Sequence, residues 1–389
     1  MPTSYVHWTA PDSATHLAGR LDEIPPIGLQ RFTYDNSWLT GPGFSLGEGL
    51  PLEAGPLSPP GGETNFGLFL DAGPDAWGRR VIRRKVRPLP SSTTGFILAA
   101  ADETRQGALR FSNQPDGPFL SEGGPESLES LDDLYREVQQ FQQDENAPGQ
   151  FARLLRAGTS QGGFRPKAVV KGPDGGLWIA KFPSETDTYD VETCEAAALD
   201  VARQAGLQVP EFKHLRVNDW QAILLVKRFD RIDNGRLGFQ SMRTVTRLGS
   251  DEYADYQMMA ATAGYLCGVE GRRAILGAAT LNIVVNNIDD HARNFGFLQD
   301  ANGQWAPSPL FDVVPSPLQS DGTPLQSGTP GRSLEQLVDL DWGVPKAAGF
   351  VSHIAEVAAQ VYRIGVDVYG FDGEAAETAE KYRSSVVAL

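Results

Sequence analysis

Two polar side chains in the segment 286–298, NNIDDHARNFGFL, have the types and the spacing that a proton transfer beside a metal ion requires. Asp289 lies five residues before Asn294, between apolar runs. A carboxylate can accept a proton from a hydroxyl group and an amide oxygen can bind Mg²⁺, so one loop could hold both a base and a metal ligand. Asp290 is only four residues from Asn294, so Asp289 fits the base better. The alternative is that these Asn and Asp residues simply cap a loop, because both types favour turns.

Three further side chains stand at positions that phosphoryl transfer would use. Asp312 follows Asn294 by 18 residues, where a second magnesium ligand would follow a catalytic loop. Strand alternation places Lys181 on the otherwise apolar face of a predicted hairpin. Glu195 lies on the predicted helix that follows and could form an ion pair with this lysine. Lys181 and a magnesium ion held by Asn294 and Asp312 would neutralise charge on a triphosphate.

A glycine pair precedes the lysine, in the stretch TSQGGFRPK at residues 159–167. Gly162 and Gly163 would let backbone N–H groups approach a phosphate closely. The stretch is neither a Walker loop nor G-x-G-x-x-G, and taken alone it is better explained as an ordinary turn. Its position matters more, because phosphate loop, lysine, glutamate, base with amide, and metal aspartate follow one another in the order of a protein kinase.

The distribution of predicted elements indicates an α+β protein with several parts. The 389 residues, 41% of them hydrophobic, suffice for two or three cores. A small α+β unit is expected over 1–125, with a helix at 76–86, and a helical connector over 126–149. A β-rich part, 150–235, contains the hairpin with its turn at 172–176 and a helix at 191–205. The part 236–389 is mainly helical, and its segment 316–333, poor in apolar residues, is expected to be a mobile loop.

Composition limits the classes of function. The formal charge is 34 minus 49, or −15. A negative net charge disfavours binding to nucleic acid through the electrostatic field of the whole chain. The basic segment 79–88, RRVIRRKVRP, fits either a solvated helix face or a local contact with a partner. Cys194 and Cys267 lie in Ala-rich helical patterns and are expected to be buried thiols. The sequence shows no leader and no long apolar run, so a protein of the reducing cytoplasm is expected, without membrane contact.

The ordered motifs resemble those of HipA-like serine/threonine kinases, the toxin component of a bacterial toxin–antitoxin system. The similar stretches are SQGGFRPKAVV, LWIAKFPS, LQVP, LLVKRFDR, NNIDDHARNFGFL and LFDVVPS. Toward the N-terminus, LAGRL, RFTYDNSWL, FLDAGPDAWGRR and RQGALRF resemble patterns of that family's N-terminal subdomain. The resemblance therefore covers nearly the whole chain. It implies a two-lobed protein-kinase-like fold, with a β-rich lobe and an α-helical lobe, and an additional small N-terminal α+β subdomain.

The resemblance also implies roles for individual residues. Asp289 matches the proton acceptor, Asn294 and Asp312 the magnesium ligands, and Lys181 the lysine on the ATP phosphates, with Glu195 as its supporting ion pair. The other positions implied to line ATP are Gly162, Gly163, Phe164, Arg165, Pro166, Lys167, Lys227, Arg228, Phe229, His291 and Phe311. Ser160 matches a serine that family members autophosphorylate.

The cofactors that the resemblance implies are ATP and Mg²⁺, and the substrate is a protein Ser or Thr, for example on an aminoacyl-tRNA synthetase. A small DNA-binding antitoxin of HipB type is implied as partner, with DNA contacted only through it. Three alternatives stay open: a catalytically weak scaffold that acts with the antitoxin as a repressor, a small-molecule or lipid kinase, and a metal-dependent hydrolase built on Asp289, Asp290 and His291.

Overall fold

The computed structural model describes residues 3–41, 43–119, 125–143, 151–157, 165–248, 254–316, 322–328 and 332–386. The chain divides into two compact units. Unit 1 comprises residues 1–185, 227–240 and 298–304, and unit 2 comprises residues 186–226, 241–297 and 305–389.

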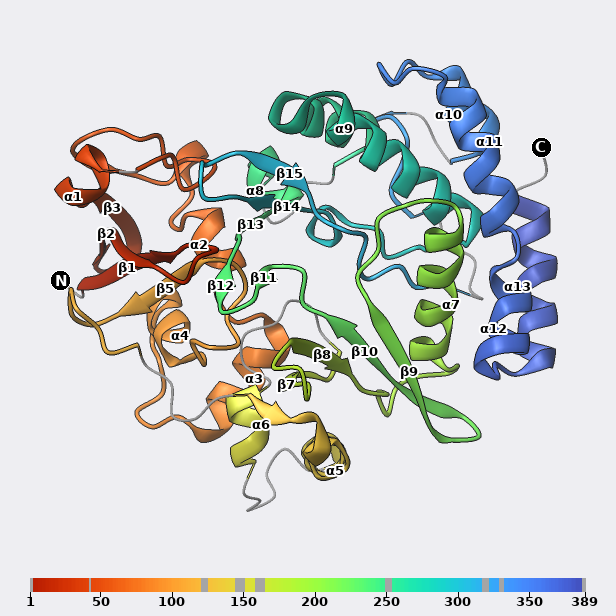
Figure 1. Ribbon diagram of the computed structural model, residues 1–389, viewed down its shortest axis with the longest axis horizontal. Helices are drawn as coiled ribbons and strands as arrows, with labels where there is room; N and C mark the ends of the chain where they lie inside the picture. The colour runs from red at the N-terminus through yellow and green to blue at the C-terminus, as the bar shows by residue number, and fades with distance from the viewer. Residues whose placement is uncertain are drawn as a thin grey trace. The chain divides into compact units, whose positions relative to one another are not determined.

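Unit 1 begins with an antiparallel sheet of five strands in the order β4-β3-β2-β1-β5 (Figure 1). The strands are β1 (Thr3–Thr9), β2 (Thr15–Ile24), β3 (Leu29–Tyr34), β4 (Pro56–Leu57) and β5 (Leu109–Ser112). Aromatic side chains from the sheet and its loops fill the core, with Trp8, Phe32 and Trp38 at most 3% exposed. In β3, buried residues alternate with more exposed ones, and this alternation fixes the register of the strand.

The helices of unit 1 are short. They are α1 (Asn36–Thr40), α2 (Gly67–Asp71), α3 (Ala76–Lys85), α4 (Thr93–Ala99), α5 (Leu131–Gln143) and α6 (Ala152–Ala157), with 3₁₀ turns at Pro60–Gly62 and Leu128–Ser130. Helix α3 confirms the helix expected at 76–86, and Asp75 caps it by accepting a hydrogen bond from Gly78 N at 2.6 Å. The guanidinium groups of Arg79 and Arg83 lie over the ring of Phe96, at 5.0 and 5.5 Å from its centroid. Part of the basic segment is therefore bound to its own unit.

The predicted hairpin is present as strands β7 (Lys167–Lys171) and β8 (Leu177–Lys181), next to the short strand β6 (Glu126–Ser127). Its turn lies at 172–176, where Gly172 N donates to Gly176 O at 2.8 Å and Gly175 adopts φ +80°. Trp178 and Ala180 are buried, whereas Lys181 lies on the opposite, half-buried face. Alternation in a strand thus places the lysine as predicted.

Unit 1 also contains β11 (Arg231–Ile232), β12 (Gly235–Arg236) and most of β13 (Gly238–Ser241). The strand β14 (Gly296–Gln299) crosses the division between the units, and β15 (Trp305–Pro307) belongs to unit 2.

Unit 2 begins with helix α7 (Val191–Gln204) and the hairpin of β9 (Phe212–Asn218) and β10 (Gln221–Lys227), whose last residue falls in unit 1. Asp190 caps α7 by accepting a hydrogen bond from Thr193 N at 3.1 Å, and Gly206 at φ +78° ends the helical turn. Helix α7 therefore confirms the helix predicted at 191–205.

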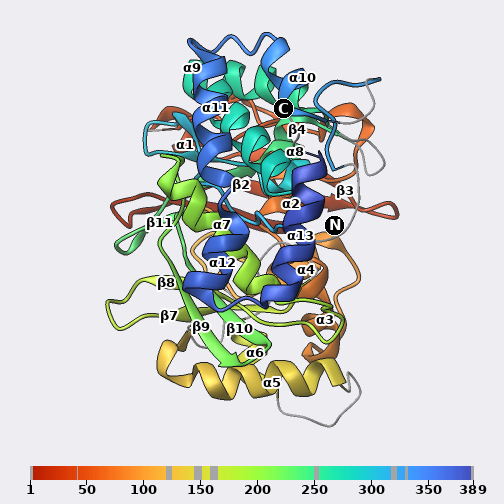
Figure 2. The same ribbon diagram turned by 90° about the vertical axis from the view of Figure 1, so that its right-hand side faces the viewer.

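The rest of unit 2 is mainly helical, as predicted. Its helices are α8 (Met242–Thr246), α9 (Tyr256–Val284), α10 (Leu334–Asp339), α11 (Ala347–Ala358), α12 (Val361–Tyr369) and α13 (Gly373–Val386), with a 3₁₀ turn at Ala292–Asn294. Gly268, at φ +64°, breaks α9 into two helical pieces. Figure 2 shows α7, α12 and α13 side by side, and α11 contacts both α7 and α9. These helices enclose one hydrophobic core around the C-terminal half of α9.

The predicted α+β class is confirmed, while the expected boundaries near residues 125, 149 and 235 remain predictions. Among the described residues, no helix has both the length and the apolar character needed to cross a bilayer.

Candidate functional site

The segment that carries Asp289 follows the C-terminus of α9 and is fixed to unit 2 by amide side chains. Asn286 adopts φ +56°, and its side chain donates to Ser316 O at 2.7 Å. The side chain of Asn287 donates to Asn282 Oδ1 at 3.1 Å and accepts from Asp289 N at 3.2 Å. Asn286 and Asn287 are both at most 3% exposed. The two Asn residues therefore hold the chain as it turns from the helix into the loop.

Asp289 and Asn294 meet within this loop, as their spacing predicted. The Asn294 side chain donates to the Asp289 backbone carbonyl at 2.7 Å. This bond uses the NH₂ group, so the amide oxygen of Asn294 stays available as an acceptor or metal ligand. The Asp289 carboxylate is 82% exposed, and its Oδ1 lies 3.7 Å from His291 Nε2. A carboxylate that is this exposed is accessible to a hydroxyl group of another molecule.

Asp312 is the third member of the group, and it acts electrostatically on Asp289. The chain around it is tied to the loop by an isolated β-bridge between Asn287 and Pro315 and by a bond from Ser316 N to Asn286 O at 3.1 Å. Asp312 adopts φ +55°, a left-handed conformation that is uncommon outside glycine and recurs at functional sites.

The surroundings of Asp289 favour the protonated form of its carboxyl. Loss of solvation raises the pKa of this group above its ordinary value, while the charge of His291 lowers it and the charges of Asp312 and Asp290 raise it again. Because the side chain is largely exposed, solvent screens these charges. The direction suits a base that must accept a proton beside other carboxylates.

We expect the Asp289 carboxyl of the metal-free protein to titrate above the ordinary value of about 3.9. A carboxyl with a raised pKa is protonated first as the pH falls, so its ¹³C signal should move at a higher pH than in an unstructured peptide. His291→Gln should raise the midpoint further, because the histidine lowers the pKa of Asp289. A midpoint at or below about 3.9, measured by NMR, would contradict this electrostatic description.

The residues fit a magnesium ion that is completed by phosphate oxygens. Among the described residues, no group of three or more His, Cys, Asp or Glu side chains could hold a metal by itself. Mg²⁺ commonly takes one or two protein oxygens and fills the other positions with water and substrate phosphates. Asp312 and the amide oxygen of Asn294 would supply those two ligands.

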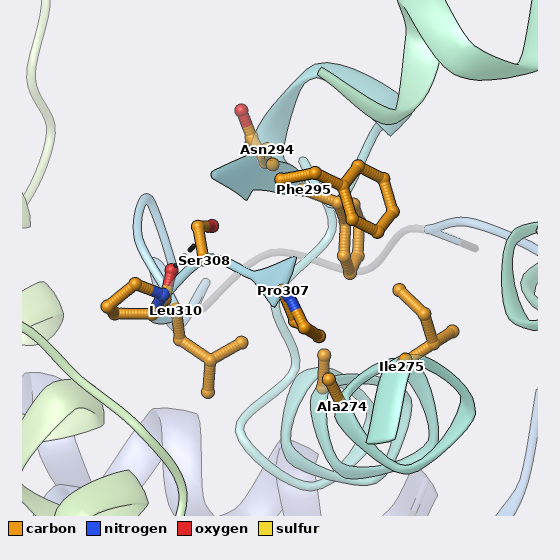
Figure 3. Close-up of a pocket in the computed structure, with 12 residues that line it drawn as sticks. Ala274, Ile275, Asn294, Phe295, Pro307, Ser308 and Leu310 are labelled. Carbon is orange, nitrogen blue, oxygen red and sulfur yellow. Dashed lines mark hydrogen bonds between the residues drawn. The ribbon is translucent and has the colours of Figure 1, made fainter. Parts of the chain in front are cut away.

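A small pocket lies directly behind the loop and is shown in Figure 3. Its volume is about 30 Å³, and it is lined by residues 271–278 of α9, residues 294–297 and residues 307–310. It has room for water but not for a nucleotide. Phe295 and Ile275 face it, whereas the amide oxygen of Asn294 points away from it (Figure 3). The residues that line this pocket therefore support the loop from behind.

The predicted lysine and glutamate lie in different units. Lys181 ends β8 in unit 1, and Glu195 lies on α7 in unit 2, where it is 2% exposed. A buried glutamate requires a compensating partner, so burial agrees with the ion-pairing role. The pairing of Lys181 with Glu195 remains a prediction.

The predicted phosphate loop falls mostly outside the described residues, which exclude Ser160, Gly162, Gly163 and Phe164. Its last members are described. Arg165 is half-buried, and Pro166 is buried and accepts a hydrogen bond from Phe182 N at 3.0 Å. Lys167 is 6% exposed, with its Nζ 3.6 Å from an oxygen of Asp75. Lys167 therefore has a structural role inside unit 1, and its nucleotide role remains a prediction.

The predicted adenine-holding segment 227–229 also lies in unit 1. Lys227 Nζ is 3.6 Å from Asp174 and 5.5 Å from the ring centroid of Trp178. Phe229 is half-buried, as is Phe311 in unit 2. Arg228 is 6% exposed, and its guanidinium is used inside unit 1, so a nucleotide contact there would have to use the main chain.

The partner of Arg228 is Asp230, which is 3% exposed and collects several hydrogen bonds. Its oxygens accept from Arg228 Nε at 2.8 Å, Arg231 Nη1 at 2.9 Å and Gly107 N at 2.7 Å. Burial opposes the charge, but the two arginines outweigh burial and hold the pKa of Asp230 far below its ordinary range. Arg228 also donates to Thr104 O at 2.6 Å. This cluster fixes the segment 227–231 to residues 104–107.

The sequence favoured Asp289 over Asp290 as the base and did not reveal the partners of Asp290, which are Tyr256, Thr323 and Arg332. Arg332 did carry a signal, since it is the only basic residue in the low-complexity segment 316–333. Asp290 is buried, and its oxygens already bind these three residues. A hydrolytic metal site that includes Asp290 is therefore disfavoured.

Comparisons with known proteins agree with the motifs. The family model of the HipA-like C-terminal domain matches residues 159–364. The structure is similar to that of HipA from Shewanella oneidensis MR-1, solved with HipB and operator DNA, at 18% identity and a TM-score of 0.66 over 98% of this chain and 96% of that chain. A second similarity, to the proinflammatory kinase CtkA of Helicobacter pylori, has 14% identity, covers 57% of this chain and 90% of that chain, and has a TM-score of 0.44, too low to indicate a common fold. Among curated proteins, none matches.

The domain match spans more than half of the 389 residues and contains every predicted site residue, from Ser160 to Asp312. The structural similarity shows in addition that this chain and the solved HipA share a fold over almost the full length of both chains. The resemblance read from the motifs is thereby confirmed, and the chain belongs to the HipA-like family.

Proposed function

We propose that this chain is an ATP- and Mg²⁺-dependent serine/threonine protein kinase of HipA type with a two-lobed kinase-like arrangement and an additional N-terminal subdomain. The observation that carries the proposal is the group formed by Asp289, Asn294 and Asp312 in unit 2. It supplies one exposed carboxylate and two oxygen ligands suited to magnesium, the set that phosphoryl transfer to a hydroxyl group requires.

Each residue has a separate task in the proposed reaction. Asp289 accepts the proton of the substrate hydroxyl as the oxygen attacks phosphorus. Asn294 and Asp312 would hold Mg²⁺, and Lys181 would bind the phosphates. Bound ATP would supply the γ-phosphoryl group and leave as ADP, and Mg²⁺ would neutralise charge on the phosphates. Phosphoryl transfer asks for positioning and charge neutralisation more than for covalent help, so these few side chains suffice.

The proposal includes a setting in a toxin–antitoxin module in the cytoplasm. The solved HipA of Shewanella oneidensis was crystallised with HipB and operator DNA, and the likeness covers almost the whole of this chain. This supports a HipB-type antitoxin as partner, with DNA reached through it. A translation-related protein such as an aminoacyl-tRNA synthetase is the proposed substrate, and Ser160 is the proposed autophosphorylation site.

Purified protein should transfer label from [γ-³²P]ATP to protein hydroxyl groups, and the transfer should require Mg²⁺. Phosphoserine or phosphothreonine should be recovered after acid hydrolysis, and mass spectrometry of the chain should find phosphate on Ser160. Asp312→Ala should abolish transfer by removing a magnesium ligand, whereas the exposed control Asp367→Ala should not. Label found only in metabolites or lipids would favour a small-molecule kinase, and no transfer by a folded protein would favour the scaffold alternative.

A further inference from the structure

Asp290, the neighbour of the proposed base, is the centre of a buried hydrogen-bond network in unit 2. Its side chain has no exposed surface. Oδ1 accepts from Thr323 N at 2.7 Å, and Oδ2 accepts from Arg332 Nη1 at 2.5 Å and from the Tyr256 hydroxyl. The Thr323 hydroxyl donates to the Asp290 carbonyl at 2.9 Å. A buried carboxylate needs such compensation, and here every partner comes from outside the loop.

The guanidinium group of Arg332 binds the loop at two points. Its Nη1 pairs with Asp290, and its Nη2 donates to the carbonyl of Asn287. Asn287 in turn accepts the N–H of Asp289 through its side chain at 3.2 Å. The Arg332 side chain is only 7% exposed, so water screens this contact little. A continuous path of hydrogen bonds therefore runs from Arg332 to the main chain of the base.

The residues 322–328 are held against the start of α9. Tyr256 N donates to Pro324 O at 3.0 Å, and Gln257 N donates to Leu325 O at 3.1 Å. Leu325 is 2% exposed and belongs to the core of unit 2. The sequence predicted a mobile loop over 316–333. In the part of it that the structure describes, residues 322–328, the main chain is hydrogen-bonded to α9 and Leu325 is buried, while residues 326–328 are exposed. Local composition could not reveal these partners, because they are more than 60 residues away in the chain.

Gly322 is packed directly against the guanidinium of Arg332. A Cβ atom built on Gly322 would lie 2.3 Å from Arg332 Cζ, and the residue has φ +25°. A Cβ atom at this distance would displace the guanidinium, which is the far end of a flexible side chain. The positive φ also favours glycine at this position.

We propose that Asp290, Arg332 and Gly322 form a latch that fixes the catalytic loop and the segment 322–328 in one arrangement, with Asp290 as a positioning residue for Asp289. The inference rests on the proposed kinase function. Protein kinases often order the segment after the metal aspartate by pairing an added phosphate with arginine. In this chain an aspartate of the loop pairs with an arginine that follows the segment, so the pairing needs no added phosphate.

The latch is tested with two variants that break it in different ways. Arg332→Gln removes the charge, and Gly322→Ala displaces the guanidinium without changing any charge. Both should lower kcat about 10- to 100-fold, because a small displacement of a catalytic group has this cost. The KM for ATP should stay within about twofold, because neither residue touches the proposed metal ligands. Hydrogen exchange over 322–328 should become faster in both variants, and Arg332→Lys should restore part of kcat.

Matched controls are Arg363→Gln on α12, whose guanidinium is exposed, and Gly349→Ala on α11, where a Cβ would meet nothing within 4 Å. Both should keep wild-type kcat and wild-type exchange. Faster exchange with unchanged kcat in the two test variants would overturn the positioning role, and so would unchanged exchange. A folded wild-type protein that transfers no phosphate would instead overturn the proposed function, and the inference with it.

Discussion

Asp289→Asn is expected to lower kcat for phosphate transfer about 10²- to 10⁴-fold, the usual contribution of a general base. Asparagine has nearly the same shape as aspartate, but its amide cannot accept the proton of the attacking hydroxyl. The backbone carbonyl of Asp289, which accepts from Asn294, is kept in the variant. The KM for Mg·ATP should therefore change little.

The matched control for this prediction is Asp367→Asn, an exposed aspartate on α12 that carries the same change of charge. Initial rates with saturating Mg·ATP compare both variants with the wild type. A folded Asp289→Asn protein with a wild-type kcat would show that another group accepts the proton. In that case the spacing of Asp289 and Asn294 would be explained by the capping of a loop.

Asp230→Asn is expected to destabilise unit 1 by about 3–5 kcal/mol at pH 7, because removing the charge leaves buried arginines without compensation. Two side chains depend on this carboxylate directly: Arg228 and Arg231. Urea unfolding followed by tryptophan fluorescence measures the change in unfolding free energy. The control is Asp116→Asn, an exposed aspartate of the same unit, which should stay within about 0.5 kcal/mol of the wild type.

The difference in unfolding free energy between the wild type and Asp230→Asn should depend on pH, with a sign that follows from the pKa of Asp230. The pKa of Asp230 is depressed in the folded state, so its stabilising contribution is present above the unfolded pKa of about 3.9 and is lost as the pH falls toward the folded value. The difference between wild type and Asp230→Asn should be constant from pH 7 to 5 and shrink below about pH 4. A difference that grows on acidification would contradict the ion-pair description.

Local patterns predicted the elements that carry the site. The hairpin β7–β8 was predicted from strand alternation around a glycine turn, and helix α7 confirms the helix predicted at 191–205. The spacing of Asp289 and Asn294 left the capping of a loop open, and the order of the surrounding motifs favoured a catalytic loop. In the structure the Asn294 side chain binds the Asp289 carbonyl. The proximity of Asp312 to Asp289 needed more than spacing. This proximity was predicted from the order of the motifs, because that order is typical of a fold that brings distant segments together.

The residues that the sequence did not reveal are joined across long separations. Tyr256 and Asp290 are 34 residues apart, and Asp290 and Arg332 are 42 residues apart. No periodicity links such positions, and their contacts depend on tertiary packing. The same holds for Arg228, which the family resemblance implied to line ATP but whose side chain is buried with Asp230. The residues of one loop that could take part in a reaction were therefore predictable from the sequence. The residues that hold this loop in place were found only in the structure.

Quantitative phosphoproteomics of cells that express the wild type, compared with cells that express Asp289→Asn at the same level, tests the central claim most directly. The account predicts a small set of Ser or Thr sites on cellular proteins that are phosphorylated only with the wild-type chain, with the phosphate derived from ATP. Identical phosphoproteomes, with both proteins folded and equally abundant, would contradict the assignment of Asp289, Asn294 and Asp312 as a protein-kinase site.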